Sequence, residues 1–128
     1  MDRQAIATKD APAAVGPYSQ AIAAGELVFC SGQVHLDPTS GTLVEGDIGA
    51  QTERVLQNLS AVLEATGLSL ADAVKTTVFL VDINDFGAMN EVYGRYMADP
   101  PPARSTIGVA ALPKGARIEI ELIAARPT

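Results

Sequence analysis

The chain contains few of the residue types on which metal-dependent and redox chemistry rely. Its 128 residues include one histidine, His35, one cysteine, Cys30, and no tryptophan. Zinc sites use three or four histidine, cysteine or carboxylate ligands, so these two residues provide no credible zinc ligand set. A single cysteine cannot form a disulfide within the chain, which is typical of a protein of the cytoplasm. We therefore predict a cytoplasmic protein without a metal site.

Sequence motifs for nucleotides, membranes and secretion are also missing. The chain has neither a GxGxxG fingerprint nor a Walker-type phosphate loop, so nucleotide binding has no motif support. No apolar run approaches the ~18–20 residues that a membrane-spanning helix needs. Residues 1–20 lack the apolar segment of a signal peptide. A nucleotide-binding, membrane or secreted protein is therefore not expected.

The charge balance is acidic. Asp and Glu number 15 and Lys and Arg number 9, which gives a net charge of −6 with the histidine neutral. Such a surface repels phosphate backbones and anionic lipids, so nucleic-acid and membrane partners are disfavoured. Hydrophobic residues make up 48% of the chain, enough to fill a core. The length fits a single domain, residues 1–128.

Several short segments are β-prone. Residues 18–23 and 26–32 predict a hairpin that turns near Gly25, after the short β-prone segment RQAIAT. Three later segments combine β-branched and apolar residues and also predict strands: AVKTTVFLVD, ARSTIGVAAL and ARIEIELIAA. The first of these is nearly continuously apolar, so we expect it in the interior of a sheet.

Two segments show helical spacing of apolar residues. Asp47 is a suitable N-cap for a helix with one apolar face between residues 48 and 63, and Gly67 is a good stop for it. A second helix is predicted to open at Asn84 or Asp85. Its apolar stripe consists of Phe86, Met89, Tyr93, Tyr96 and Met97.

These elements predict an α+β fold. The simplest arrangement is a mixed sheet with both helices packed on one face. Two helices cannot cover both faces of a sheet, and several residues on the remaining face are apolar or small. We therefore expect the chain to self-associate through the uncovered face.

The most informative polar residues lie in the last two predicted strands. Glu119 and Glu121 alternate with apolar residues, so one face of that strand is core and the other carries two carboxylates. Arg104 and Thr106 share a face of the preceding strand. If the two strands are neighbours across the turn 113–115, Arg104 lies near the carboxylates. This pattern fits either a surface ion-pair ladder or a small-anion site built on the guanidinium.

The other reactive side chains have simpler interpretations. His35 precedes a turn and is interpreted as an ordinary surface imidazole. Cys30 follows three apolar residues of a strand and is better explained as a buried small hydrophobe than as a nucleophile. Ser31 with His35 and any aspartate is not a triad signal by sequence alone.

Four segments together resemble the Rid family, the reactive intermediate deaminases, also known as the YjgF-type or L-PSP endoribonuclease family. They are APAAVGPYSQA, VFCSGQV, VKTTVFLVDINDFGAMNEVY and PPPARSTIGVAALPKGARIEIELIA, and the resemblance runs from about residue 5 to residue 126. It implies a chorismate-mutase-like fold, a homotrimer whose sheets line a central barrel, and active clefts at the subunit interfaces. It also implies hydrolysis of 2-imino acids such as 2-iminobutanoate and 2-iminopropanoate to 2-oxo acids and ammonia, without cofactor or metal.

The resemblance assigns roles to individual residues. By motif, Arg104 of PARST would grip the substrate carboxylate, and Glu119, the first glutamate of IEIE, would position the attacking water. Tyr18 of GPYSQ would border the cleft from a neighbouring chain. The remaining substrate-binding positions would be Ser31, Gly32, Asn90 and Thr106. The last of these is cysteine in some members, so a thiol nucleophile at that place is excluded here.

Two other functions remain open. The family's second name suggests an RNA-cleaving or translation-inhibiting protein, but the chain has no basic stripe and no pair of catalytic histidines. The other alternative is a non-catalytic protein that binds a small carboxylate through Arg104. Glu119 favours catalysis over this alternative, because an anion sensor has little need of a carboxylate beside its ligand.

Overall fold

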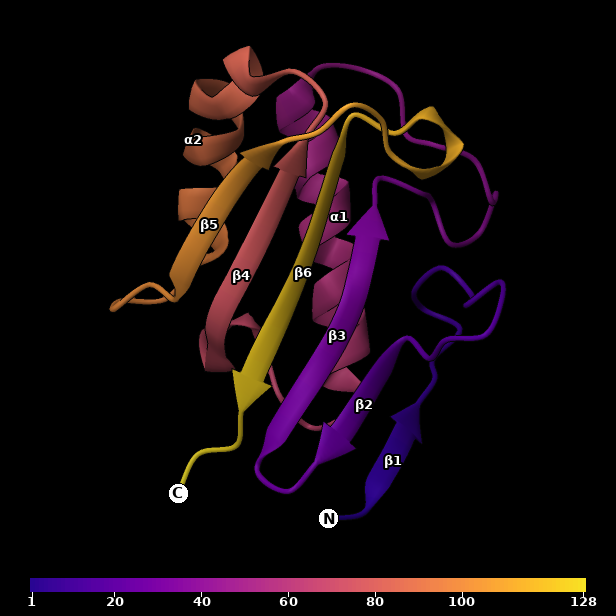
Figure 1. Cartoon of the computed structure of the whole chain (residues 1–128), viewed down its shortest axis with the longest axis vertical. Coiled ribbons are helices and arrows are strands. Elements are labelled where there is room, and N and C mark those ends of the chain that lie inside the picture. The colour runs from indigo at the N-terminus through magenta and orange to yellow at the C-terminus, as the bar shows by residue number, and fades with distance from the viewer.

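The computed structural model describes all 128 residues, which form one six-stranded sheet with two helices on a single face (Figure 1). This arrangement confirms the predicted α+β layer. The elements are β1 (Arg3–Ile6), β2 (Ala21–Ala24), β3 (Leu27–Val34), α1 (Ile48–Glu64), β4 (Ala73–Leu80), α2 (Phe86–Tyr96), β5 (Ala103–Gly108) and β6 (Ile118–Ala125), with short 3-10 turns at Leu70–Asp72, Ile83–Asp85 and Pro113–Gly115.

The strand order is β1-β2-β3-β6-β4-β5, and only the β4–β5 pair is parallel. The prediction that β5 and β6 might be neighbours is therefore wrong, because β4 lies between them. After β4 the chain passes through α2 and returns in the same direction, so β5 pairs in parallel on the outer side of β4. The segment after β5 then crosses the end of β4 to reach β6 (Figure 1).

Helix α1 forms where the sequence predicts it. Asp47 is its N-cap and accepts a hydrogen bond from the Ala50 N–H at 2.8 Å, and Gly67 has a left-handed φ of 83° after the helix ends. The apolar face of α1 is fully buried against the sheet at Val55, Leu56, Leu59, Val62 and Leu63. None of the helices meets the length and hydropathy that a membrane-spanning helix requires.

The start of α2 agrees with the prediction in position, with Asp85 as the N-cap residue, but not in its capping contact. Asp82 caps a preceding 3-10 turn by accepting from the Asn84 N–H at 3.0 Å, and the α-helix begins at Phe86. Asp85 occupies the N-cap position but makes no capping hydrogen bond with its side chain. Its carboxylate instead pairs with Arg117 at 3.2 Å, because the turn before β6 lies beside it.

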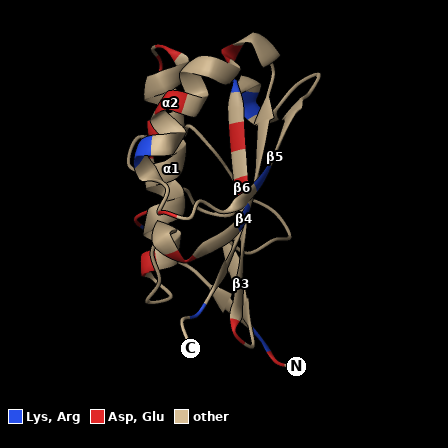
Figure 2. Cartoon of the chain, turned by 90° about the vertical axis from the view of Figure 1, so that its left-hand side faces the viewer, with Lys and Arg blue, Asp and Glu red and all other residues tan.

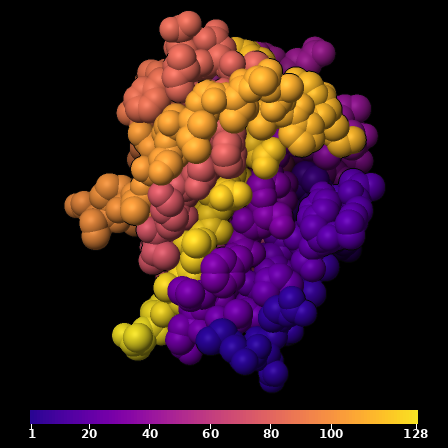
Figure 3. All heavy atoms as spheres, viewed as in Figure 1, coloured from indigo at the N-terminus to yellow at the C-terminus, as the bar shows by residue number.

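The two faces of the sheet are unlike. The helix-facing side is the core, and its strand residues Val28, Val78, Leu80, Ile118 and Ile120 have no exposed surface. No element covers the other side (Figures 2 and 3). Its apolar side chains include Leu27, Phe29 and Ile107, which are 39%, 42% and 44% exposed.

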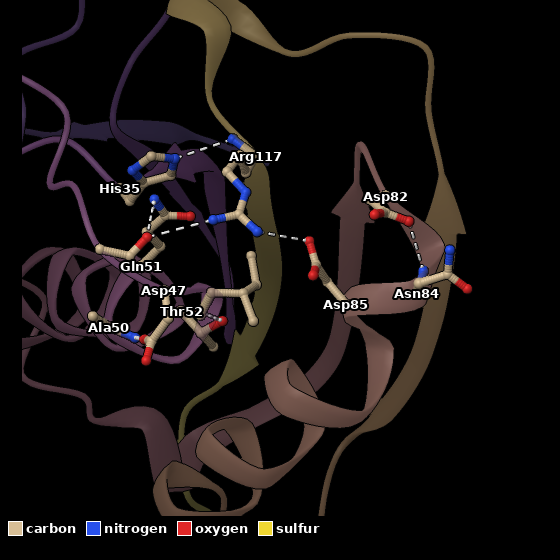
Figure 4. A network of polar contacts seen from close by, with 11 residues as sticks. His35, Asp47, Ala50, Gln51, Thr52, Asp82, Asn84, Asp85 and Arg117 are labelled. Atoms are coloured by element: carbon tan, nitrogen blue, oxygen red, sulfur yellow. Dashed lines mark hydrogen bonds and ion pairs between the residues drawn. The ribbon is translucent and has the colours of Figure 1, made fainter.

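His35 is buried, so its interpretation as a surface imidazole is wrong. The residue is 3% exposed; Nδ1 lies 2.9 Å from the Val44 carbonyl oxygen, and Nε2 accepts from the Arg117 N–H at 3.0 Å. Both contacts are satisfied by a neutral ring with its proton on Nδ1. The loop after β3 folds back against the turn before β6 and covers the ring, which a local sequence pattern does not reveal (Figure 4).

The burial of His35 predicts a pH-dependent stability. Burial lowers the pKa of His35 from its ordinary value of 6.5, and the nearby charge of Arg117 lowers it further, against an opposing hydrogen bond to Val44. The stabilisation by neutral His35 is therefore complete above pH 6.5 and is lost as the pH falls from there through the folded pKa.

We expect His35→Gln to remove this part of the pH dependence. Urea unfolding of both proteins between about pH 7.5 and pH 5 measures it. The wild type should lose more stability than the variant over that interval. Equal losses in the two proteins would show that the imidazole does not titrate with folding.

Candidate functional site

A hollow of about 700 Å³ opens on the uncovered face of the sheet beside Glu119. The N-terminal loop, the end of β3, the turn before β6 and β6 itself line it. Four of the predicted site residues meet here: Tyr18, Ser31, Gly32 and Glu119. Residues that lie about a hundred positions apart in the sequence thus line one hollow, and their role in a functional site stays a prediction.

A β-bulge shapes the floor of this hollow. The β3–β6 ladder shifts register so that Ser31 and Gly32 together stand opposite Glu121. The bulge sets the backbone of Gly32 directly against the Glu119 carboxyl group. A Cβ atom at Gly32 would lie 2.8 Å from Glu119 Cδ and would overlap Oε2. Only glycine leaves room for the carboxylate in this position.

Glu119 binds a proton more readily than an ordinary glutamate. Burial raises the pKa of Glu119 above its ordinary value, and the carboxylate of Glu121 on the same face raises it further. The side chain is half-buried and has no hydrogen-bond partner within the chain. Its oxygens are thus free to bind a water molecule in the hollow, which is a general-base geometry.

Tyr18 and Ser31 form the side of the hollow next to the N-terminal loop. Tyr18 is 52% exposed, and its hydroxyl oxygen accepts from the Val15 N–H at 3.3 Å. The Ser31 hydroxyl donates to the Ser19 carbonyl oxygen at 2.5 Å, which ties the bulge to that loop. Ser31 therefore keeps its oxygen lone pairs available to a ligand but has committed its proton.

Arg104 lies in a second hollow, of about 600 Å³, between α2 and the proline segment before β5. Its Nη1 donates to Asn90 Oδ1 at 2.6 Å. Its guanidinium carbon also lies 4.8 Å from the ring centre of Tyr93 and 5.4 Å from that of Phe86. Two aromatic faces and one amide thus fix the guanidinium, with donors left over for a ligand carboxylate.

The side chain of Tyr93 is fixed by a hydrogen bond to strand β4. Its hydroxyl lies 2.6 Å from the hydroxyl of Thr76, which is completely buried in β4. Thr106, on the same face of β5 as Arg104, has a buried hydroxyl oxygen without a partner and lines neither hollow. The structure therefore brings Arg104 and Asn90 together and leaves Thr106 beside them.

Within one chain, the two hollows lie on opposite sides of the sheet. Arg104 pairs with Thr76 across the β4–β5 ladder, and both point to the helix face. Glu119 pairs with Phe79 across the β4–β6 ladder, and both point to the uncovered face. The suggestion that Arg104 and Thr106 lie near Glu119 or Glu121 in the same chain is thus wrong. A single small substrate cannot touch Arg104 and Glu119 of one chain.

Two residues that position Arg104 were missed as functional residues in the sequence. Phe86 and Tyr93 were interpreted only as members of the apolar stripe of α2. Their spacing from Asn90, four and three positions, places all three on one helical face. An asparagine between two aromatics at that spacing is a signal that could have indicated a ring-lined polar site.

Cys30 is not part of either hollow. It is 6% exposed on the helix-facing side, and burial raises the pKa of its thiol to about 12. The prediction of a buried small hydrophobe is confirmed. No group of three or more His, Cys, Asp or Glu side chains in the structure is placed to hold a metal ion.

Gly32→Ala tests the contact between the bulge and Glu119. The added methyl group forces the Glu119 carboxylate out of its position, so we expect a loss of activity of roughly 10²-fold, comparable to misplacing a catalytic group by about 1 Å. The melting temperature should change little, because the carboxylate can move into open solvent. Activity assays with thermal unfolding measure both effects.

Gly87→Ala is the matched control, since a Cβ there meets nothing within 4 Å. Full activity in Gly32→Ala would contradict the described geometry.

Comparisons with known proteins agree with this architecture. The profile of the family described as Endoribonuclease L-PSP matches residues 8–126. The chain is 50% identical to the 2-iminobutanoate/2-iminopropanoate deaminase of Rattus norvegicus and 48% identical to that of Homo sapiens, each over 122 residues that cover 95% of this chain and 89% of the relative.

One solved structure resembles this chain at about the same level of sequence identity. RidA from an Antarctic bacterium, Psychrobacter sp., superposes with a TM-score of 0.92 at 49% identity, over 95% of this chain and 98% of that one. The chorismate-mutase-like arrangement of a mixed sheet with two helices on one face is thereby confirmed.

Proposed function

The chain belongs to the Rid (endoribonuclease L-PSP) family, and we propose that it is a cytoplasmic enzyme that hydrolyses 2-imino acids. The substrates are 2-iminobutanoate and 2-iminopropanoate, and the products are 2-oxo acids and ammonia. Relatives named for this reaction match nearly the whole chain at about half identity, which supports the assignment.

The active site is shared between two copies of the chain in a homotrimer. One observation carries this proposal: the carboxylate-binding and water-binding groups lie on opposite faces of the same sheet. A complete site forms only if the Arg104 hollow of one copy meets the Glu119 hollow of the next. The uncovered apolar face of the sheet supports such an assembly, because exposed side chains such as Phe29 and Ile107 are natural interface residues.

The reaction requires only water and the described side chains. Arg104 takes the substrate carboxylate through a pair of N–H donors and fixes the imine carbon in place. The imine is bound with its nitrogen protonated, and Glu119 accepts one proton from the water that adds to the imine carbon, which gives a neutral carbinolamine. Glu119 then returns this proton to the amine nitrogen and takes the hydroxyl proton as the C–N bond breaks, so that ammonia leaves and the 2-oxo acid remains. Positioning supplies much of the rate gain, because a protonated imine is already a strong electrophile.

The remaining predicted residues have supporting roles in this scheme. Asn90 orients the guanidinium of Arg104 through its 2.6 Å hydrogen bond. Tyr18, Ser31 and Gly32 border the water side of the cleft from the neighbouring copy. Thr106 contributes a hydroxyl group beside the anchor and no nucleophile, which agrees with direct attack by water.

The test is to generate 2-iminobutanoate in situ and to follow 2-oxobutanoate with and without the protein. We expect the protein to shorten the lifetime of the imine. An unchanged lifetime, with tight binding of 2-oxobutanoate, would instead support the alternative of a small-carboxylate binding protein. RNA cleavage is disfavoured by the net charge of −6 and by the engagement of the single histidine in the fold.

A further inference from the structure

Lys114 has a backbone conformation that every other residue of this chain except glycine avoids. Its φ is 61° and its ψ is 14°, and it is the only residue other than glycine with a positive φ. The left-handed region costs an ordinary side chain about 1–2 kcal/mol per residue relative to the right-handed one, and glycine is the usual occupant. A lysine at this position therefore disfavours the fold slightly, and such outliers are concentrated at functional sites.

The turn that carries Lys114 is held in place from both ends. The Gly115 N–H donates to the Leu112 carbonyl oxygen at 3.3 Å, and the Ala116 N–H donates to the Pro113 carbonyl oxygen at 3.1 Å. The next residue, Arg117, donates its N–H to the buried His35 ring. The Cα of Lys114 is thus fixed beside the Glu119 hollow, and the residue lines both this hollow and the neighbouring one that contains His35 and Arg117.

Lys114 is the only cation among the residues of this chain that line that hollow. The same hollow contains the carboxylates of Glu119 and Glu121, and the chain as a whole carries a net charge of −6. Lys114 makes no ion pair and no side-chain hydrogen bond in the structure. Its ammonium group is therefore free to act on an approaching ligand.

The two carboxylates repel the proposed substrate. A 2-imino acid is an anion, and the hollow that contains the catalytic water presents two carboxylates to it. A cation at the mouth of a cleft raises the local concentration of an anionic ligand and its rate of association. The guanidinium of Arg104 cannot supply this effect from within the same chain, because it lies on the other face of the sheet.

We propose that Lys114 is a steering residue that draws the anionic substrate past the two carboxylates into the cleft. The inference rests on the proposed function, and it adds a residue that acts on substrate capture rather than on the chemical step. Lys114 attracts the substrate carboxylate at the rim, and Arg104 of the neighbouring copy then binds it. The hydrogen bonds of the turn hold the left-handed backbone, which keeps the Cα of Lys114 beside the hollow and its ammonium group within reach of an entering anion.

The test compares Lys114→Gly, Lys114→Arg and a control with the same change in net charge, Arg95→Gln. Glycine adopts the same φ, so Lys114→Gly should unfold at or above the melting temperature of the wild type. Its kcat/KM for 2-iminobutanoate should fall about 3- to 10-fold at low ionic strength, mainly through KM, and should depend less on salt. Lys114→Arg should keep the salt dependence of the wild type. Arg95 is exposed on α2, pairs with Glu91 and lines neither hollow, so its replacement should leave both parameters unchanged.

Binding of 2-oxobutanoate, measured by calorimetry at several salt concentrations, separates this inference from the proposed function. If the wild type does not hydrolyse the imine but its 2-oxobutanoate affinity depends on Lys114 and on salt, the proposed reaction is wrong and the steering role stands. If the wild type is active and Lys114→Gly matches it in kcat/KM, in affinity and in salt dependence, the steering role is overturned.

Discussion

Arg104→Ala is expected to lower kcat/KM for 2-iminobutanoate by about 10²- to 10³-fold, the effect of removing one partner of a desolvated, hydrogen-bonded charge pair. The substrate carboxylate then loses its only matched pair of donors, and the imine carbon is no longer fixed against the water. Arg104→Lys should recover only a small part of the loss, because an ammonium group cannot present a planar fork between the rings of Phe86 and Tyr93.

Steady-state kinetics and thermal unfolding together test this prediction. Arg95→Ala, which removes an exposed cation of α2, is the matched control and should keep wild-type kinetics. The Arg104 variants should stay folded, since the side chain projects from the edge strand β5 and is not itself part of the buried core. Wild-type kcat/KM in folded Arg104→Ala would show that Arg104 does not bind the substrate carboxylate.

Glu119→Gln is expected to lower kcat by about 10²- to 10⁴-fold, the usual contribution of a general base. The amide keeps the size of the side chain and its contact with Gly32 but cannot accept the proton of the attacking water. After subtraction of the spontaneous rate at each pH, wild-type activity should fall as the pH drops through the raised pKa of Glu119, because protonation removes the base. The residual activity of the variant should lack that acidic limb.

The stability of Glu119→Gln is expected to change in the opposite direction from its activity. A carboxyl group whose pKa is raised by folding destabilises the folded state as the pH rises through the folded pKa. Glu119→Gln should therefore be at least as stable as the wild type at neutral pH. Glu64→Gln is the control, because it makes the same chemical change at an exposed position of α1 that lines neither hollow. High activity in Glu119→Gln, or an unchanged acidic limb, would contradict its role as the base.

Local patterns in the sequence were sufficient to predict the elements that depend on near neighbours. Helix α1 follows from the Asp47 cap, the apolar spacing and Gly67, all of which act within a few residues. The alternation along β6 correctly separated the core residues from Glu119 and Glu121. Family motifs added the grouping of Tyr18 with the β3 bulge, which spacing alone does not indicate.

The relation between strands could not be predicted in the same way. Alternation shows which residues of a strand share a face. It does not show whether that face points toward the helices or toward the uncovered side of the sheet. On β6 the polar residues lie on the uncovered side, whereas Arg104 of the edge strand β5 lies on the helix side, where α2 leaves room for it. The burial of His35 and the bulge at Gly32 likewise depend on segments that meet only after folding.

Subunit complementation tests the central claim most directly. Arg104→Ala and Glu119→Gln chains, each nearly inactive alone, are co-expressed with different tags and the mixed oligomers are isolated. If each site joins Arg104 of one copy to Glu119 of another, every mixed trimer contains one intact site of its three, so roughly a third of the wild-type activity should return. Mixed oligomers with no more activity than their parents would contradict a site shared between chains.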